Sequence, residues 1–160
     1  MSWFAHHSRY PLDSLLTLVI LLQSYDRRLH RDQVRFGSAS FGPPAQVTYY
    51  ATVAPEMANK NGTLHGGCAA TLIDALSSTL LVGLGQPGRF SLGGITRALD
   101  LKFLRAVPVG VEIAIVCEVV HVGRRLALLK AEIRRRDTGD VCVVGEHDKA
   151  NTDPVDSAKI

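Results

Sequence analysis

The 160-residue sequence has little cysteine and no strong excess of charge of either sign. Its three cysteines, Cys68, Cys117 and Cys142, form no C-x-x-C pair and have apolar neighbours. This pattern favours reduced, buried thiols in an intracellular protein over a zinc site or a disulfide framework. Eighteen Lys and Arg residues against 15 Asp and Glu residues give a net charge of +3, so we expect no nucleic-acid partner unless the basic residues cluster.

A long hydrophobic run is also missing from the sequence. Its most apolar stretch, residues 15–22, is interrupted at Thr17 and is far shorter than the roughly 20 residues that cross a bilayer. We therefore expect no transmembrane segment. An apolar fraction of 46% and a charged fraction of 21% predict a globular domain with one core.

Residues 1–42 differ from the rest of the chain and are interpreted as an N-terminal extension. Asp13 or Ser14 can cap a helix that continues to about Asp32 with apolar residues at helical spacing. The many arginines of this segment are also typical of a mitochondrial presequence, although its aspartates argue against that interpretation. A basic region, an apolar region and a small-residue cleavage site do not follow one another here as they do in a secretory signal, so export is not expected. A cytoplasmic location is expected, with a mitochondrial one as the alternative.

The middle of the sequence changes between loop, strand and helix signals. Residues 38–44 are interpreted as a loop because they contain Gly42 and two prolines. Residues 46–54 alternate as a strand does, and residues 55–62 are again interpreted as a loop. Over residues 64–82 apolar side chains occur on all sides, which predicts a central helix that other elements surround.

The sequence after this helix carries only strand signals. Four strands are expected, at residues 95–104, 111–122, 126–136 and 141–149. Together these elements predict an α+β fold in which one antiparallel sheet wraps around one long helix. The domain is expected over residues 43–150, and residues 151–160 are expected to form a flexible tail.

A dense group of polar and small residues lies where the loop becomes the helix. His65, Gly66 and Gly67 stand at the helix start, where backbone N–H groups lack partners and attract a developing oxyanion. Glycine also lets a substrate carbonyl approach the backbone closely. A plain glycine-rich turn before a packed helix would explain the same residues.

Asp74 lies among apolar residues in the middle of the expected helix. A carboxylate there loses solvation, a cost that is tolerated where the group has partners or chemical work. Alternatively, it emerges at a small polar patch with Ser77 and Ser78. Asn59 and His65 bring an amide and an imidazole close to the helix start, and each of them alone is also explained as a structural residue.

In combination, these residues resemble the hotdog-fold thioesterases of the PaaI and acyl-CoA thioesterase 13 type. The shared pattern is Asn59-x-x-Gly62-Thr63-Leu64-His65-Gly66-Gly67, then Ala70-Thr71-Leu72-x-Asp74 and Ser77-Ser78. It continues through Ile95-Thr96-Arg97, Phe103-Leu104-Arg105, Val109-Gly110 and Gly145-x-His147-x-Lys149. The resemblance covers about residues 46–150 and does not include residues 1–42.

The resemblance implies the hotdog fold and the hydrolysis of an acyl-CoA thioester to the free acid and CoA. Asp74 matches the family's catalytic carboxylate, which acts as general base or nucleophile, and Gly66 matches the amide that polarises the carbonyl. Asn59 matches an asparagine that helps at this carbonyl, and His65 matches the residue that orients substrate or assists the leaving thiolate. Thr96 stands where the family has a serine that helps to hold the attacking water, and because the hydroxyl is retained we expect the same role. Such chemistry needs no metal or other cofactor, and none is expected.

Helix geometry adds an independent argument for a homo-oligomer. His65 and Asp74 are nine residues apart, which puts them on opposite sides of a helix and about 13 Å apart along it. One chain cannot bring Asp74 to the Gly66 amide, but two antiparallel copies of the helix bring these groups together twice. We expect a dimer or a tetramer in which Asp74 and Thr96 come from one subunit and the helix start from the other.

The candidate substrate-binding residues are Gly67, Arg97, Arg124, Arg125 and Lys149. The cationic side chains can bind the phosphates of CoA, although solvated strand ends are also rich in arginine. Two other functions stay open: a non-catalytic dimer that binds acyl thioesters, and a thioesterase for acyl carrier protein in lipid or polyketide synthesis. The sequence does not identify the acyl group.

Overall fold

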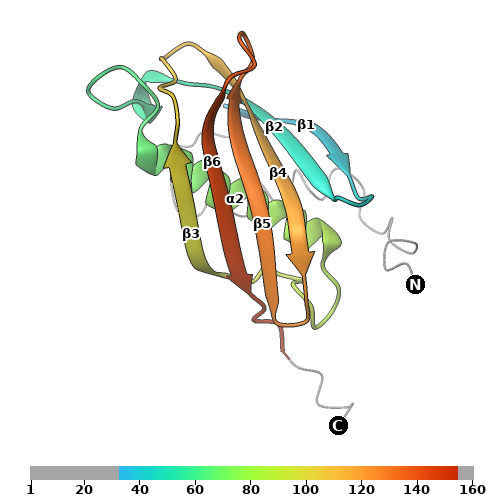
Figure 1. The fold of residues 1–160 in the computed structure, drawn as a ribbon. Helices are drawn as coiled ribbons and strands as arrows, with labels where there is room; N and C mark the ends of the chain where they lie inside the picture. Colours follow the sequence, from blue (N-terminus) through green and yellow to red (C-terminus); the bar gives the residue numbers. More distant parts are fainter. Residues whose placement is uncertain (1–32, 155–160) are drawn as a thin grey trace.

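The computed structural model describes residues 33–154. These residues form β1 (Val34–Ser40), β2 (Gln46–Thr52), the 3-10 helix η2 (Pro55–Met57), α2 (Gly66–Leu84), β3 (Ile95–Phe103), β4 (Glu112–Val122), β5 (Leu126–Arg135) and β6 (Val141–Ala150). The strands make one antiparallel sheet in the order β1-β2-β4-β5-β6-β3. The sheet curls around α2, with β3 at one edge and β1 at the other (Figure 1). The predicted antiparallel sheet around a central helix is confirmed.

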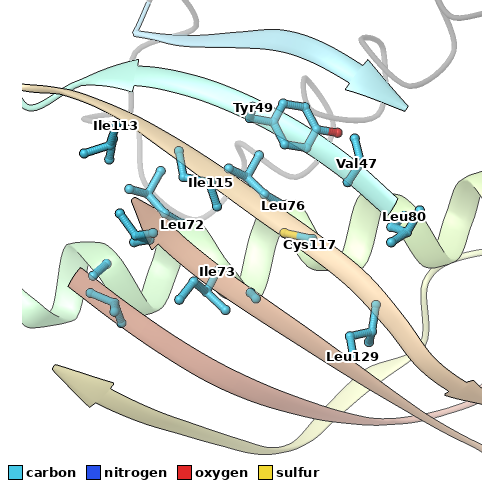
Figure 2. Close-up of a cluster of buried hydrophobic side chains, with 14 of the residues drawn as sticks. Val47, Tyr49, Leu72, Ile73, Leu76, Leu80, Ile113, Ile115, Cys117 and Leu129 are labelled. Atoms are coloured by element: carbon cyan, nitrogen blue, oxygen red, sulfur yellow. The ribbon is translucent and has the colours of Figure 1, made fainter. Parts of the chain in front are cut away.

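The core lies between the inner face of the sheet and α2 (Figure 2). Alternate residues of β2 and β4, such as Tyr49 and Ile115, are buried against one side of the helix. On α2, Leu72, Ile73 and Leu80 are almost fully buried. Each such side chain contributes roughly 1.5–3 kcal/mol when it leaves water. The helix is therefore fixed along its length, and so are the polar groups that it carries.

By length and composition, α2 is also apolar enough to cross a membrane, with a mean hydropathy of 1.6 over 18 residues. However, 56% of that window is buried inside the domain, and the polar residues Asp74, Ser77 and Ser78 interrupt it. These two observations fit the core helix of a globular domain.

β1 is the element that the sequence did not reveal. Residues 38–40 were expected in a loop, but they form the end of a strand that pairs with β2, from Val34 opposite Ala51 to Ser40 opposite Gln46. As an edge strand, β1 has one hydrogen-bonded neighbour and only partly buried side chains, so its alternation is weak. The sheet therefore includes residues from Val34 on, about nine residues before the predicted boundary at residue 43. The helix expected up to Asp32 lies outside the described residues.

All three cysteines lie in the described part of the chain, and none of them is in a disulfide. Cys117 and Cys142 are buried, and burial raises the pKa of the Cys117 thiol to about 12. Cys68, in the first turn of α2, is partly exposed. The expected burial is confirmed for Cys117 and Cys142 but not for Cys68.

Candidate active site

Asp74 is the centre of a polar cluster on α2. Its Oδ1 atom accepts a hydrogen bond from the Thr96 hydroxyl at 2.8 Å and lies 3.1 Å from Nε2 of His147. The same Nε2 atom lies 2.9 Å from the Thr96 hydroxyl oxygen, so the three side chains form a triangle. Thr96 comes from β3 and His147 from β6, which are antiparallel neighbours in the sheet. Three segments far apart in the sequence therefore meet at this carboxylate.

His147 is fully buried, and both of its ring nitrogens have partners. Its Nδ1 atom is 2.7 Å from the Ser77 hydroxyl oxygen, one turn along the helix from Asp74. His147 belongs to the family pattern but was not predicted as a site residue. A signal was present, because Gly145, His147 and Lys149 alternate on the buried face of β6, where apolar residues are the rule.

A second contact joins β6 to the same turn of α2. The Ser78 hydroxyl donates to the backbone carbonyl of Asp74 at 2.7 Å and accepts from the Lys149 ammonium at 2.6 Å. Lys149 is only 3% exposed. This burial is the opposite of what a contact with a CoA phosphate requires, so Lys149 does not suit the substrate-binding role expected of it.

The surroundings favour the ionised form of Asp74. The pKa of this carboxyl lies below its usual value, chiefly because His147 hydrogen-bonds to it. Partial burial opposes this shift, while the Thr96 hydroxyl and the charges of His147 and Lys149 support it. The side chain is 48% exposed, and both contacts reach Oδ1. A carboxylate that is ionised, fixed at one oxygen and open to solvent is suited to activate a water molecule.

The start of α2 is organised by backbone groups. His65 caps the helix, and its Nδ1 atom accepts the Gly67 N–H at 2.9 Å. The Gly66 N–H is the first of the helix, a position for which the helix provides no acceptor. Close packing explains the glycine, because a Cβ atom on Gly66 would lie 3.3 Å from Cζ of Phe103. A donor of this kind at a helix N-terminus suits an anionic oxygen.

A groove of about 340 Å³ lies beside the Gly66 amide. Apolar residues such as Leu64, Phe103 and Val107 make up most of its lining, and Asn59 lies at its border. The groove is therefore suited to an apolar group that is attached to a carbonyl.

Asn59 organises the loop that leads to α2. Its Oδ1 atom accepts the N–H groups of Asn61 and Thr63 at 2.9 and 3.3 Å, and its Nδ2 group donates to the Thr63 hydroxyl at 2.9 Å. These contacts match the structural interpretation of this residue. Its expected contribution at the substrate carbonyl stays a prediction.

The two parts of the site do not meet within one chain. Gly66 and Asp74 are eight residues apart in α2, about 12 Å along the helix axis. Asp74 and Thr96 are not among the residues that line the groove at Gly66. In the described chain, the carboxylate and the amide therefore lie at separate places on α2.

The arginines expected to bind phosphate lie on the surface. Arg97 forms an ion pair with Asp148 at 3.1 Å, and Arg124 and Arg125 are exposed in the turn between β4 and β5. Their role stays a prediction. Among residues 33–154, His, Cys, Asp and Glu do not gather in groups of three that could hold a metal ion.

Comparison with known proteins places these observations in a family. Residues 61–142 match the model of the Thioesterase superfamily. Mouse acyl-coenzyme A thioesterase 13 is 27% identical over 140 residues, which are 86% of this chain and 92% of that protein. Its human counterpart is 30% identical over 108 residues, which are 66% of this chain and 73% of that protein.

A comparison of structures agrees with this. The crystal structure of zebrafish thioesterase superfamily member 2 has a TM-score of 0.76 and 25% identity, and covers 88% of this chain and 98% of that one. The PaaI protein of E. coli, at 16% identity and a TM-score of 0.67, supports the fold alone, over 87% of this chain and 94% of that one. Since the matched family region is more than half of the sequence, this chain belongs to the thioesterase superfamily and is a hotdog-fold thioester hydrolase.

Proposed function

We propose that this protein hydrolyses acyl-CoA thioesters to the free acid and CoA, in two sites that a homodimer shares across its interface. The ionised, half-exposed carboxylate of Asp74, bound by Thr96 and His147, is the observation that carries the proposal. The name of the mouse and human relatives, acyl-coenzyme A thioesterase 13, supports CoA thioesters as the substrate class.

In the proposed reaction, Asp74 takes a proton from a water molecule whose oxygen attacks the thioester carbonyl carbon. The Thr96 hydroxyl donates its hydrogen to Asp74 and faces Nε2 of His147, and a hydroxyl oxygen has two lone pairs. Even with the Nε2 hydrogen of His147 directed to the Thr96 oxygen, one lone pair of that oxygen is left to accept a hydrogen from the attacking water. Direct attack by the Asp74 carboxylate, through an anhydride that water then hydrolyses, is the alternative course.

The other half of the reaction belongs to the helix start. As water attacks, the carbonyl oxygen becomes negative and accepts the N–H of Gly66 from the second protomer. The C–S bond then breaks, and the proton that Asp74 removed goes to the thiolate of CoA. His65 lies next to this point, and because its Nδ1 atom accepts from Gly67, the neutral ring has its hydrogen on Nε2.

The exposed edge of the sheet supports assembly into a dimer. β3 pairs with β6 on one side only, so its other side has unpaired backbone groups. Ile95, Phe103 and Leu104, on this strand and directly after it, are 52–57% exposed. A second copy that pairs along β3 would cover these side chains. Whether two such dimers form a tetramer is decided by the mass of the protein in solution.

Contacts with CoA are proposed for Arg97, Arg124 and Arg125, since guanidinium groups bind phosphates through paired hydrogen bonds. The location of the protein is proposed to be cytoplasmic. Residues 1–42 fused to a fluorescent reporter test this, and import of the reporter into mitochondria would support the alternative.

The substitution Asp74→Asn tests the proposed function. It keeps the shape of the side chain but removes the base, so kcat for acyl-CoA hydrolysis should fall by about 10³-fold. The measurement is thiol release from a panel of acyl-CoAs that differ in chain length and in aromatic content. The matched control is Asp137→Asn, in the exposed turn between β5 and β6, which should leave kcat unchanged.

Three results would contradict the proposal. Full activity of the Asp74→Asn variant would remove the carboxylate from the mechanism. Wild-type protein that binds acyl-CoA without releasing thiol would instead be a non-catalytic binder. Turnover with acyl carrier protein substrates but not with CoA substrates would identify a different carrier.

A further inference from the structure

Lys149 is a buried cation that the proposed reaction does not use. It lies near the end of β6, on the inner face of the sheet, and is 3% exposed. Its ammonium donates to the Ser78 hydroxyl at 2.6 Å. A buried charge is costly unless it is paired or hydrogen-bonded, so this position needs an explanation.

The contact fixes the direction of the Ser78 hydroxyl. A serine hydroxyl has one hydrogen, and Ser78 donates it to the backbone carbonyl of Asp74 at 2.7 Å. Because Lys149 has only donors, Ser78 must accept from it. The cation is thus linked through one hydroxyl to the helix turn that carries Asp74.

The surroundings of Lys149 contain one carboxylate that acts on it. On α2 this is Asp74, whose negative charge favours the charged form of Lys149. The cross-strand neighbours of Lys149 are the uncharged Thr96 on β3 and Ala127 on β5. His147, two residues before it on β6, contacts the same Asp74 carboxylate.

We propose that Lys149 is a positioning residue for Asp74: through Ser78, its buried ammonium fixes the helix turn that carries the carboxylate, and it supplies positive charge to the surroundings of that turn. The inference rests on the proposed function to the extent that Asp74 is the base of the reaction. It assigns Lys149 to the interior of the active site and separates it from the exposed arginines.

The electrostatic shifts agree with this geometry. The charge of Lys149 lowers the pKa of Asp74, although it is the smallest of the five causes that act on this carboxyl. Burial lowers the pKa of Lys149 itself, and the charge of Asp74 opposes that shift. The two groups therefore favour each other's charged forms.

The test replaces the cation and keeps the length of the side chain. In Lys149→Met we expect the pKa of Asp74 to rise, the acid limb of kcat/KM to move to higher pH, and kcat at neutral pH to fall by about tenfold with little change in KM. Ser78→Ala, which removes only the linking hydroxyl, should lower kcat by less. The matched control is Lys130→Met on the outer face of β5, where the ammonium is exposed and paired with Glu132.

A second readout needs no activity. The carboxyl carbon of Asp74 is followed by 13C NMR as the pH is lowered and is assigned with the Asp74→Asn variant. A titration of Asp74 in folded Lys149→Met that matches wild type would overturn the inference. If Lys149→Met does not fold, Ser78→Ala decides, and a wild-type kcat in that variant would overturn the inference.

The two proposals fail in different ways. A wild-type protein that does not hydrolyse acyl-CoA contradicts the proposed function, while the NMR titration still tests the coupling of Lys149 to Asp74. Normal hydrolysis with an unchanged Asp74 titration in Lys149→Met contradicts only the role of Lys149. Lys149→Arg retains a positive charge, so the pKa of Asp74 should lie nearer to the wild-type value in this variant than in Lys149→Met.

Discussion

The middle of α2 and its first turn form one helix, but their functional groups are of different kinds. At Asp74 the group is a side chain, and Thr96 and His147 hold it from strands that come later in the sequence. At Gly66 the group is a backbone N–H, and the close neighbours are the cap of His65 and the ring of Phe103. The surroundings of Asp74 act mainly through charge and hydrogen bonds, whereas those of Gly66 act mainly through shape.

This contrast predicts how each half responds to change. Loss of a partner of Asp74 should alter the pH dependence of the reaction, because these partners lower the pKa of the carboxyl. Loss of the Gly66 N–H should lower the rate at every pH, because a backbone amide does not titrate. Loss of a residue that only binds the distant part of CoA should change neither the pH dependence nor the rate of the chemical step.

Gly66→Pro should have the largest of these effects. Proline is tolerated as the first residue of a helix, and the preceding residue, His65, already has the extended conformation that precedes proline, with a ψ of 134°. The substitution removes the N–H that is proposed to stabilise the oxyanion. We expect kcat to fall by about 10²–10³-fold, with the acid limb of the pH profile unmoved.

The control for this variant is Gly66→Ala, which keeps the N–H and adds a Cβ atom 3.3 Å from Cζ of Phe103. The ring must move by a few tenths of an ångström, so we expect a loss of at most about tenfold. Equal losses in the two variants would assign the effect to crowding and not to the missing donor.

His147→Leu should have a smaller effect on rate and a clear effect on pH dependence. The hydrogen bond from His147 is the largest cause that lowers the pKa of Asp74, so its loss should raise that pKa. In the proposed mechanism, activity needs ionised Asp74 and is lost as the pH falls through its pKa. The acid limb should therefore move to higher pH, and kcat should fall by about 10–100-fold, as for a lost hydrogen bond to a charged group.

His147→Gln is the control for His147→Leu, because the side-chain amide of glutamine can still donate towards Asp74 and Thr96. It should have a pH profile between those of wild type and His147→Leu. An acid limb that stays in place in His147→Leu, with the fold intact by circular dichroism, would contradict the role given to this imidazole.

The double substitution of Arg124 and Arg125 by alanine should have the smallest effect. Exposed ion pairs contribute little individually, so we expect KM for acyl-CoA to rise by about two- to tenfold with kcat unchanged. With an acyl-pantetheine that lacks the nucleotide, the two proteins should have the same KM. A similar rise with Arg134→Ala, on the outer face of β5, would show that general surface charge causes the effect.

The local parts of the structure could be predicted from the sequence, and the parts that depend on strand order could not. α2 has a strong apolar pattern and a start at His65 and Gly66, so both the helix and the place of its first N–H could be predicted. β1 was missed because an edge strand with partly buried residues has a weak pattern.

The partners of Asp74 show the same limit. That β3 and β6 lie side by side follows from long-range pairing, which the local pattern of either strand does not specify. His147 was therefore not recognised as a contact of Asp74. Lys149 was expected to bind a CoA phosphate, but the register of β6 buries it towards the helix.

The sharing of each site between two protomers is tested by a heterodimer of Asp74→Asn and Gly66→Pro chains. The two chains are co-expressed with different affinity tags and purified through both, and thiol release from acyl-CoA is measured. One site of such a dimer combines an intact Asp74 with an intact Gly66, so the heterodimer should recover about half of the wild-type activity although each parent is nearly inactive. A heterodimer no more active than its parents would contradict the shared site.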